Sequence, residues 1–315
     1  MSSNKLNVLE ALGGAEITGV RQAAGLQVFG LRWPSGNGHE YATLDEAVES
    51  KLIDLTEVDE GGRVPTIKIL NKSNQMVFLM AGEELVGGKQ NRVLNASMMV
   101  PAKGEMPIPV TCVERGRWGY KSKNFSSSTT SSHSYLRRMV SRQATDSYKA
   151  AGTPQSDQGA VWGEIARKMA KMGSSSSSDA LHGFFEDYAK KLDALVGSFS
   201  LPEGSNGAAF VIAGKIVGAD LFDKPTTFRK LWSKLVRSYA ADALEQPEKP
   251  PPPVDSNQVV EWLKSAKSAE QHWFDSPGVG KDVRIEGPRL VGATLVLDDR
   301  PIHLELFREE EPAPA

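Results

Sequence analysis

Charged and amide side chains interrupt a stretch of the sequence that is otherwise typical of a core β-hairpin. Residues 76–80 form an apolar run that predicts a buried strand, and Gly87 and Gly88 are typical of a two-residue hairpin turn. Counting outward from that turn, the predicted pairs are Val86 with Lys89, Leu85 with Gln90, Glu84 with Asn91, and Glu83 with Arg92. Because side chains alternate between the faces of a strand, both faces would carry polar groups, whereas a core hairpin keeps one face apolar.

The hairpin residues have the types needed to bind and process an anionic ligand. Glu83 and Glu84 are candidate catalytic residues, because paired carboxyl groups can exchange protons with a substrate. Cations donate to phosphate groups, and side-chain amides both donate and accept, which suits a base or a ribose. The candidate ligand-binding residues on this hairpin are Lys89, Gln90, Asn91 and Arg92. The alternative is a structural ion pair between Glu83 and Arg92, which would contribute only roughly 0.2 to 1 kcal/mol at an exposed position.

The end of the next predicted strand, residues 108–113, adds a second group of candidates. Arg117 and Trp118 offer a charge and a stacking surface for a nucleotide, although a solvent-facing strand end would have the same composition. Glu114 lies one pleat beyond Cys112 on the same predicted face and is also assigned to ligand binding. We expect Cys112 to be a buried core cysteine rather than a nucleophile, because its face continues with apolar residues.

Two further patterns bear on other ligands. Residues 115–149 contain eight Arg and Lys residues against one Asp, interleaved with aromatic residues, as in single-strand-binding grooves. No recognised nucleic-acid-binding motif accompanies this charge, and Arg137, Arg138 and Arg142 could simply face solvent, so nucleic acid is a possible but not a favoured partner. The five histidines lack metal-ligand spacing, which predicts no metal site, and His303 is expected to face solvent.

The composition excludes several classes of protein. A chain of 315 residues with 40% hydrophobic content can bury a full core, and its formal net charge of -2 gives no global attraction to nucleic acid or an anionic membrane. A single cysteine excludes an internal disulfide framework and suits a reducing compartment. No long apolar segment occurs, so we expect a cytoplasmic protein without a membrane partner. Dinucleotide, P-loop and serine-hydrolase motifs are also lacking, so no cofactor is assigned.

Strand patterns at both ends flank a helical middle. Strands are predicted over residues 19–33, 66–70 and 108–113, and again over residues 208–222 and 283–307. Helices are predicted from a capping box at Thr43 and Glu46, from a start near Asp255, and from apolar stripes that would face the core. The stripes are Leu181, Phe184, Phe185, Tyr188, Leu192 and Leu195; Phe228, Leu231, Trp232, Leu235, Val236 and Tyr239; and Val259, Trp262 and Leu263.

Compositional bias marks the predicted loops. Residues 126–134 and 174–178 are nearly all Ser and Thr, which predicts flexible loops. Residues 250–253 are all proline and predict a stiff spacer, and residues 309–315 predict a frayed tail.

Several motifs resemble those of a prokaryotic protein family. The similar blocks are residues 82–85 (GEEL), 87–92 (GGKQNR), 109–118 (PVTCVERGRW) and 218–223 (GADLFD), the helix through Trp232 and Tyr239, and residues 302–307 (IHLELF). Over most of its length the chain therefore resembles the ADP-ribosylglycohydrolase- and rhodanese-phosphatase-superfamily-associated protein family. The resemblance implies a genomic association with ADP-ribose or nucleotide handling in stress or defence settings. It carries no reaction, and hence no catalytic role for any residue.

These patterns predict an α+β protein with a β-sandwich-like body from N- and C-terminal strands and an inserted helical subdomain. The expected parts are residues 1–125, β-rich with the motif hairpin; residues 126–200, a helical insertion with Ser-rich loops; and residues 201–315, an α+β part that rejoins the sheet. The expected function is binding or processing of a nucleotide or ADP-ribose-like anion, and the sequence does not decide whether the protein is an enzyme. The alternative is a non-catalytic interaction or sensor protein, whose Ser-rich loops and basic helices contact a protein partner.

Overall fold

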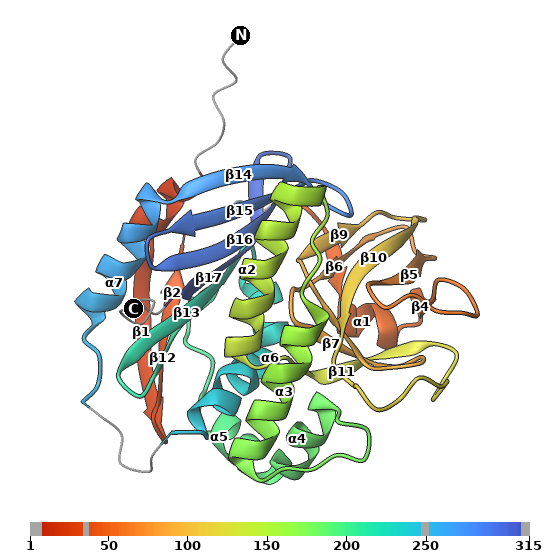
Figure 1. Ribbon diagram of the computed structural model, residues 1–315. Coiled ribbons are helices and arrows are strands. Elements are labelled where there is room, and N and C mark those ends of the chain that lie inside the picture. Colours follow the sequence, from red (N-terminus) through yellow and green to blue (C-terminus); the bar gives the residue numbers. More distant parts are fainter. Residues whose placement is uncertain (1–7, 34–37, 247–251, 310–315) are drawn as a thin grey trace.

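A computed structural model describes residues 8–33, 38–246 and 252–309 and shows an α+β fold. Two β-rich bodies lie side by side, and helices α2 and α3 run across the junction between them (Figure 1). The predicted α+β class is confirmed. Within the described ranges, no helix is long and apolar enough to cross a membrane.

The larger body is an eight-stranded antiparallel sheet built from both ends of the chain. In spatial order its strands are β1 (Glu16–Ala23), β2 (Leu26–Arg32), β12 (Gly207–Ile212), β13 (Lys215–Phe222), β17 (Arg300–Arg308), β16 (Leu290–Leu297), β15 (Lys281–Gly287) and β14 (Glu270–Asp275). β2 pairs directly with β12, so the C-terminal strands do rejoin an N-terminal hairpin. This pairing carries the chain ends into one sheet, although about 170 residues separate the two strands.

The second body contains the motif hairpin. A six-stranded sheet has the order β11 (Phe125–Ser131), β7 (Glu83–Gly87), β8 (Arg92–Leu94), β10 (Glu105–Cys112), β5 (Thr66–Asn71) and β4 (Ile53–Glu57). A three-stranded sheet has the order β3 (Tyr41–Thr43), β6 (Met76–Leu79) and β9 (Met98–Val100). β10 joins the two halves of the six-stranded sheet, because its first part pairs with β5 and its last three residues pair with β8.

Most helices fill the junction or cover the outer face of the eight-stranded sheet, whereas α1 packs within the second body. The helices are α1 (Leu44–Glu49), α2 (Ser134–Ala151), α3 (Gln158–Met172), α4 (Leu181–Asp187), α5 (Ala189–Gly197), α6 (Pro225–Ala243) and α7 (Ser256–Ser265), with short 3-10 turns η1 (Glu10–Gly14) and η2 (Ala266–Ser268). One core cluster contains Phe210 and Tyr239 together with Phe78 and Val93, so the two bodies share a continuous apolar core. The capping box predicted at Thr43 and Glu46 begins α1.

The structure corrects two predictions for the middle of the chain. Residues 125–131 form strand β11 rather than a flexible loop, and Ser128, Thr130 and Ser131 are buried there. The predicted stripe from Leu181 to Leu195 is buried but belongs to two helices, since the backbone leaves helical geometry at Tyr188. Residues 174–178 do form a loop, as predicted. Part of the predicted proline spacer and nearly all of the predicted tail lie outside the described residues.

Candidate functional site

The motif hairpin forms, but its register differs from the prediction by two residues. Glu84 pairs with Val93 and Leu85 with Arg92, so a longer loop replaces the predicted two-residue turn at Gly87 and Gly88. Side chains from other strands hold that loop, because the Lys89 amide donates to Glu57 Oε1 at 2.9 Å. Gly88 has a φ of +49° and lies against the ring of Phe125, which leaves no space for a side chain.

Glu83 lies in a buried ion pair with α6. Its Oε1 accepts from Lys234 Nζ at 2.8 Å and its Oε2 accepts from the Met80 amide at 2.8 Å. Burial raises the pKa of Glu83, and Lys234 opposes that shift. Within the described residues no ion pair joins Glu83 to Arg92, so the structural alternative drawn from the sequence was wrong about the partner.

Glu84 occupies the other face of the hairpin and pairs with a histidine. Its Oε2 lies 2.9 Å from His182 Nδ1 and accepts from Thr130 Oγ1 at 2.8 Å, while its buried Oε1 has no partner within the described part of the chain. The His182 side chain is 27% exposed, so it connects the buried carboxylate with solvent. The hydrogen bond that His182 donates to Glu84 raises the pKa of His182, and burial opposes this effect.

Asn91, Glu114 and Arg117 meet beside the hairpin loop. Glu114 Oε2 accepts from the backbone amide of Asn91 at 3.0 Å, and Arg117 Nε donates to Glu114 Oε1 at 2.9 Å. Arg117 also donates to the Gly88 carbonyl at 2.7 Å. Burial favours the neutral form of Glu114, but hydrogen bonds from Arg117, Ser178 and Asn91 lower its pKa overall. Arg117 therefore holds the hairpin loop in place and is not a solvent-facing strand end.

Arg92 is fully buried next to the single cysteine. Its guanidinium contacts Cys112 Sγ and lies 3.2 Å from Gln90 Oε1 and 3.7 Å from Glu57 Oε1. Arg92 Nε and Nη2 have no hydrogen-bond partner among the described residues. Cys112 is buried, as predicted, but the neighbouring cation was not foreseen from the sequence. An alanine at position 92 would leave Glu57 buried without its cation, so this residue is a poor test of ligand binding.

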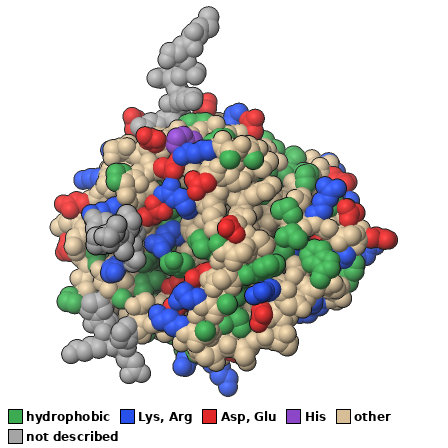
Figure 2. Space-filling model, in the orientation of Figure 1, with side chains coloured by type: hydrophobic (Ala, Val, Ile, Leu, Met, Phe, Trp, Pro, Cys, Tyr) green, Lys and Arg blue, Asp and Glu red, His purple; other side chains and the backbone are tan. Residues whose placement is uncertain are grey.

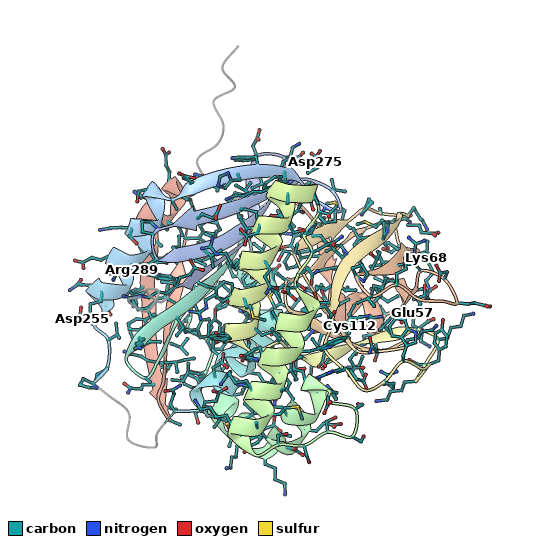
Figure 3. All side chains as sticks on the ribbon, in the orientation of Figure 1. Glu57, Lys68, Cys112, Asp255, Asp275 and Arg289 are labelled. Atoms are coloured by element: carbon teal, nitrogen blue, oxygen red, sulfur yellow. The ribbon has the colours of Figure 1, made fainter. Side chains whose placement is uncertain are left out.

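Lys89, Trp118 and Tyr120 form the exposed side of the hairpin loop. The Trp118 and Tyr120 side chains are 49% and 53% exposed, and Lys89 Nζ lies 5.5 and 5.2 Å from their ring centroids. Lys89 Nζ also donates to the Gly61 carbonyl at 2.8 Å. Tyr120 and Glu57 line an adjoining depression of about 780 Å³. Figure 3 shows Glu57 and Lys68, which line this depression, on the flank of the second body.

His303, which was predicted to face solvent, and Arg137, for which solvent exposure was the alternative to nucleic-acid binding, are both buried in the junction between the two bodies. His303 is 1% exposed, and its ring lies 2.8 Å from Ser97 Oγ and 3.2 Å from Asp220 Oδ1. Arg137 is also buried and donates to Asp220 and to Glu305. Alternation failed for His303 because β17 is covered on both faces, so polar positions on it also point into protein.

The structure thus divides the predicted site residues between the two sides of one loop. Glu84, Asn91, Glu114 and Arg117 lie on one side, and Lys89, Gln90, Arg92 and Trp118 lie on the other, whereas Glu83 points toward α6. His182 was missed, because it lies 98 residues from Glu84 and no local pattern marks it. Within the described residues, no group of three or more His, Cys, Asp and Glu side chains is arranged to hold a metal ion.

A family model matches residues 14–307, which is nearly the whole chain. The model describes the ARG and Rhodanese-Phosphatase-superfamily-associated Protein domain. The chain belongs to this family. The family expected from the hairpin motifs is therefore confirmed. No curated protein and no solved structure matches the chain.

Proposed function

We propose that this member of the ARG and Rhodanese-Phosphatase-superfamily-associated family binds a nucleotide or ADP-ribose-like anion on the exposed side of the hairpin loop. The observation that carries the proposal is the position of the Lys89 ammonium between the exposed rings of Trp118 and Tyr120. Exposed aromatic rings offer stacking surfaces to a base, and an adjacent cation attracts phosphate. The expected setting, a prokaryotic stress or defence system, is what the motif resemblance implies, whereas the family's name gives only an association with ARG and rhodanese-phosphatase-superfamily proteins.

The adjoining depression supplies further polar contacts for such a ligand. Its lining includes the cations Lys68, Lys121 and Lys123 and the acids Glu57, Asp59 and Glu60. Lysines can contact phosphate oxygens, and carboxylates can accept hydrogen bonds from ribose hydroxyls. A volume of about 780 Å³ lies within the range of small-molecule sites. This combination suits a nucleotide better than a purely anionic or purely apolar ligand.

If the protein also catalyses a reaction, the Glu84 and His182 pair is the candidate for proton transfer, on the other side of the hairpin loop from Lys89 and Trp118. Glu84 is buried and would position the imidazole, while the partly exposed ring of His182 would exchange a proton with a substrate. Lys121 lines the depression, and its positive charge acts to lower the pKa of His182, against the larger effect of Glu84. Glu83 is bound to Lys234 and has no place in this scheme.

A calorimetric titration with ADP-ribose, ADP and AMP tests the binding site. Base stacking on an aromatic ring is worth roughly 1 to 3 kcal/mol, so Trp118→Ala should weaken the best ligand by about 5-fold or more. Tyr135→Ala is the matched control, because Tyr135 is an exposed aromatic residue on α2, at 44% exposure. Equal losses in both variants, or no binding by the wild-type protein, would contradict the proposal.

The alternative, a non-catalytic interaction or sensor protein, has lost part of its expected contact surface. β11 pairs with β7 in the sheet, and Arg137 lies inside the protein. Residues 174–178 and the exposed Tyr135 remain as surface. A wild-type protein that binds none of the three nucleotides would favour this alternative, and affinity capture with the purified chain would then be the next experiment.

A further inference from the structure

The exposed side of the hairpin loop carries two aromatic rings. Trp118 and Tyr120 are both exposed, and Lys89 Nζ lies within 5.5 Å of each ring centroid, so the two rings lie on the same side of the loop. Within the described structure no ring contact joins Trp118 to Tyr120, so each ring keeps a surface of its own. A ligand with a single base, such as a mononucleotide, can stack on only one of them at a time.

Part of the Trp118 ring packs against the protein, and the rest is open to solvent. The guanidinium carbon of the buried Arg92 lies 5.7 Å from the ring centroid, and a Cβ at Gly62 would lie 3.5 Å from Trp118 Cζ2. Trp118 is nevertheless 49% exposed. The protein therefore holds the ring from one side, and a base can reach it from the other.

Two lysines without partners follow the rings in the chain. Lys121 and Lys123 are exposed and line the depression that Tyr120 also lines. Among the described residues, neither lysine side chain has an ion-pair or hydrogen-bond partner. Both belong to the basic, aromatic-rich segment of residues 115–149, and their charges remain available to a ligand.

Most of the acids in the same lining already have partners. Asp59 Oδ1 accepts from the Gly62 amide at 2.9 Å, and its Oδ2 lies 3.7 Å from Arg63 Nε. Glu57 is buried and accepts from a backbone amide of the hairpin loop. Glu60 is the other acid of the lining, so the charge left without a partner is mainly positive. Figure 2 shows hydrophobic and basic side chains next to one another on the flank of the second body.

Backbone hydrogen bonds hold the rings and the lysines along the hairpin loop. The Gly119 amide donates to the Lys89 carbonyl at 3.3 Å, and the Lys121 amide donates to the Gly88 carbonyl at 2.9 Å. The two stacking surfaces and the two cations therefore belong to one short segment, residues 118–123, whose backbone is fixed before a ligand arrives. This arrangement reduces the entropy lost on binding.

Separate stacking rings beside unpaired cations are the features with which proteins hold single-stranded nucleic acids. We propose that the ligand of this site is a single strand of nucleic acid, with neighbouring bases against Trp118 and Tyr120 and backbone phosphates at Lys121 and Lys123. This inference rests on the proposed function, because it assigns the nucleotide of the hairpin site to a strand of at least two nucleotides.

Calorimetric titration with AMP, ADP and the dinucleotide pApA tests the inference. ADP and pApA each carry two phosphate groups, but only pApA has a second base. Stacking of that base should make pApA bind at least about fivefold more tightly than ADP. Equal affinities for ADP and pApA would overturn the strand inference and leave the proposed function intact, whereas binding of none of the three would contradict both.

Tyr120→Ala tests whether the second base lies on the predicted ring. This variant should reduce the advantage of pApA over ADP to less than about twofold, because only one ring remains. Tyr135→Ala, at an exposed tyrosine on α2, is the matched control and should keep the full advantage. The inference fails if the advantage survives in Tyr120→Ala or is lost equally in the control.

Salt dependence tests the phosphate contacts. For an RNA tetra-adenylate, Lys121→Gln and Lys123→Gln should each lower the slope of log affinity against log salt concentration by roughly 0.7. Lys264→Gln is the matched control, because Lys264 is exposed on α7, on the flank opposite the second body (Figure 1). Unchanged slopes in both variants, or an equal change in the control, would overturn the proposal. The DNA tetra-adenylate, titrated in parallel, distinguishes RNA from DNA as the preferred strand.

Discussion

At the scale of single residues, the two acids of the hairpin, Glu83 and Glu84, differ in the solvent exposure of the residues they pair with. Glu83 is joined to the buried Lys234, whereas Glu84 is joined to His182, whose ring is partly exposed. Removing one member of a fully buried pair leaves the other charged and desolvated, which destabilises the whole protein. His182 can be replaced with a smaller structural effect, so it is the better position for examining proton transfer and pH dependence.

The His182 and Glu84 pair should make stability depend on pH. Glu84 raises the pKa of His182 in the folded state above its unfolded value near 6.5, so the stabilisation is complete below that value and is lost as the pH rises through the folded pKa. We expect His182→Gln to cost about 1 kcal/mol in the free energy of unfolding at about pH 5.5, and less at about pH 9. Urea unfolding at both pH values measures this difference.

A second substitution tests whether Glu84 is the group that raises the pKa of His182. In a Glu84→Gln background the carboxylate is absent, so replacing His182 should have the same effect at both pH values. A cost that still falls with rising pH in this background would assign the titration to a different neighbour, of which the exposed Glu186 at 3.7 Å is the nearest candidate.

The sequence identified most hairpin residues but not their partners. Charged residues in an apolar strand pattern stand out locally, and this is why Glu84, Asn91 and Arg117 could be singled out. The partners of Glu83, Arg92 and Glu84 come from α6, β4 and the start of α4, which are distant in the chain and have ordinary compositions. His182 in particular follows a serine run and begins an amphipathic helix, and neither pattern distinguishes it from a surface histidine.

At the scale of elements, β11 shows why a serine-rich composition did not produce a loop. Ser127 Oγ donates to the partly exposed Asp45, and Thr130 Oγ1 donates to the buried Glu84, so the hydroxyl groups satisfy neighbouring carboxylates. Small polar side chains can therefore fill a strand whose neighbours are charged, and composition alone does not reveal those neighbours. The predicted amphipathic helices were more reliable, because their apolar spacing is a local property of the sequence.

Amide hydrogen exchange should distinguish the two serine-rich segments. β11 pairs with β7 through Ser126 and Ser127, whereas residues 174–178 form a loop with no strand partner in the described structure. We expect the slowest amides of β11 to exchange at least roughly tenfold more slowly than those of residues 174–178. Mass spectrometry of peptides from both segments gives the comparison within one sample. Equal, rapid exchange would show that β11 opens as readily as a loop.

The same reasoning applies to the hairpin register. Two consecutive glycines, Gly87 and Gly88, are typical of a tight turn, and a two-residue turn was therefore predicted there. Glu57 of β4 and Glu114, two residues beyond β10, instead accept hydrogen bonds from the backbone amides of Lys89 and Asn91 in the loop. Contacts from outside the hairpin therefore stabilise a longer loop, and no pattern within residues 82–94 could have indicated them.

At the scale of the whole molecule, a buried polar network connects the two β bodies. Asp220 of the large sheet accepts from Arg137 of α2 and from Tyr239 of α6, and it lies 3.2 Å from the His303 ring. The same ring lies 2.8 Å from Ser97, which belongs to the loop before β9 in the second body. Together with the shared apolar core, this network predicts that both bodies unfold in one cooperative transition.

Acid should weaken this junction. Burial favours the neutral form of Asp220, but Arg137 and His303 more than compensate and hold its pKa well below the ordinary value. A lowered folded pKa stabilises the protein above the unfolded pKa, near 3.9, and that stabilisation is lost as the pH falls toward the folded value. Asp220→Asn should therefore cost roughly 3 kcal/mol at neutral pH, and the difference from wild type should narrow below about pH 4.

Two probes of the same unfolding experiment test this junction. In wild-type protein, far-ultraviolet circular dichroism and tryptophan fluorescence should give coincident urea transitions, because neither body can lose its core without exposing the other. Tyr239→Phe is a milder control, since it removes one hydrogen bond to Asp220 while keeping the ring stacked on Phe210. If Asp220→Asn separates the transitions and Tyr239→Phe does not, the charge at the junction couples the two bodies. Separate transitions in the wild type would instead mean that each body folds independently and that the junction is only a contact surface.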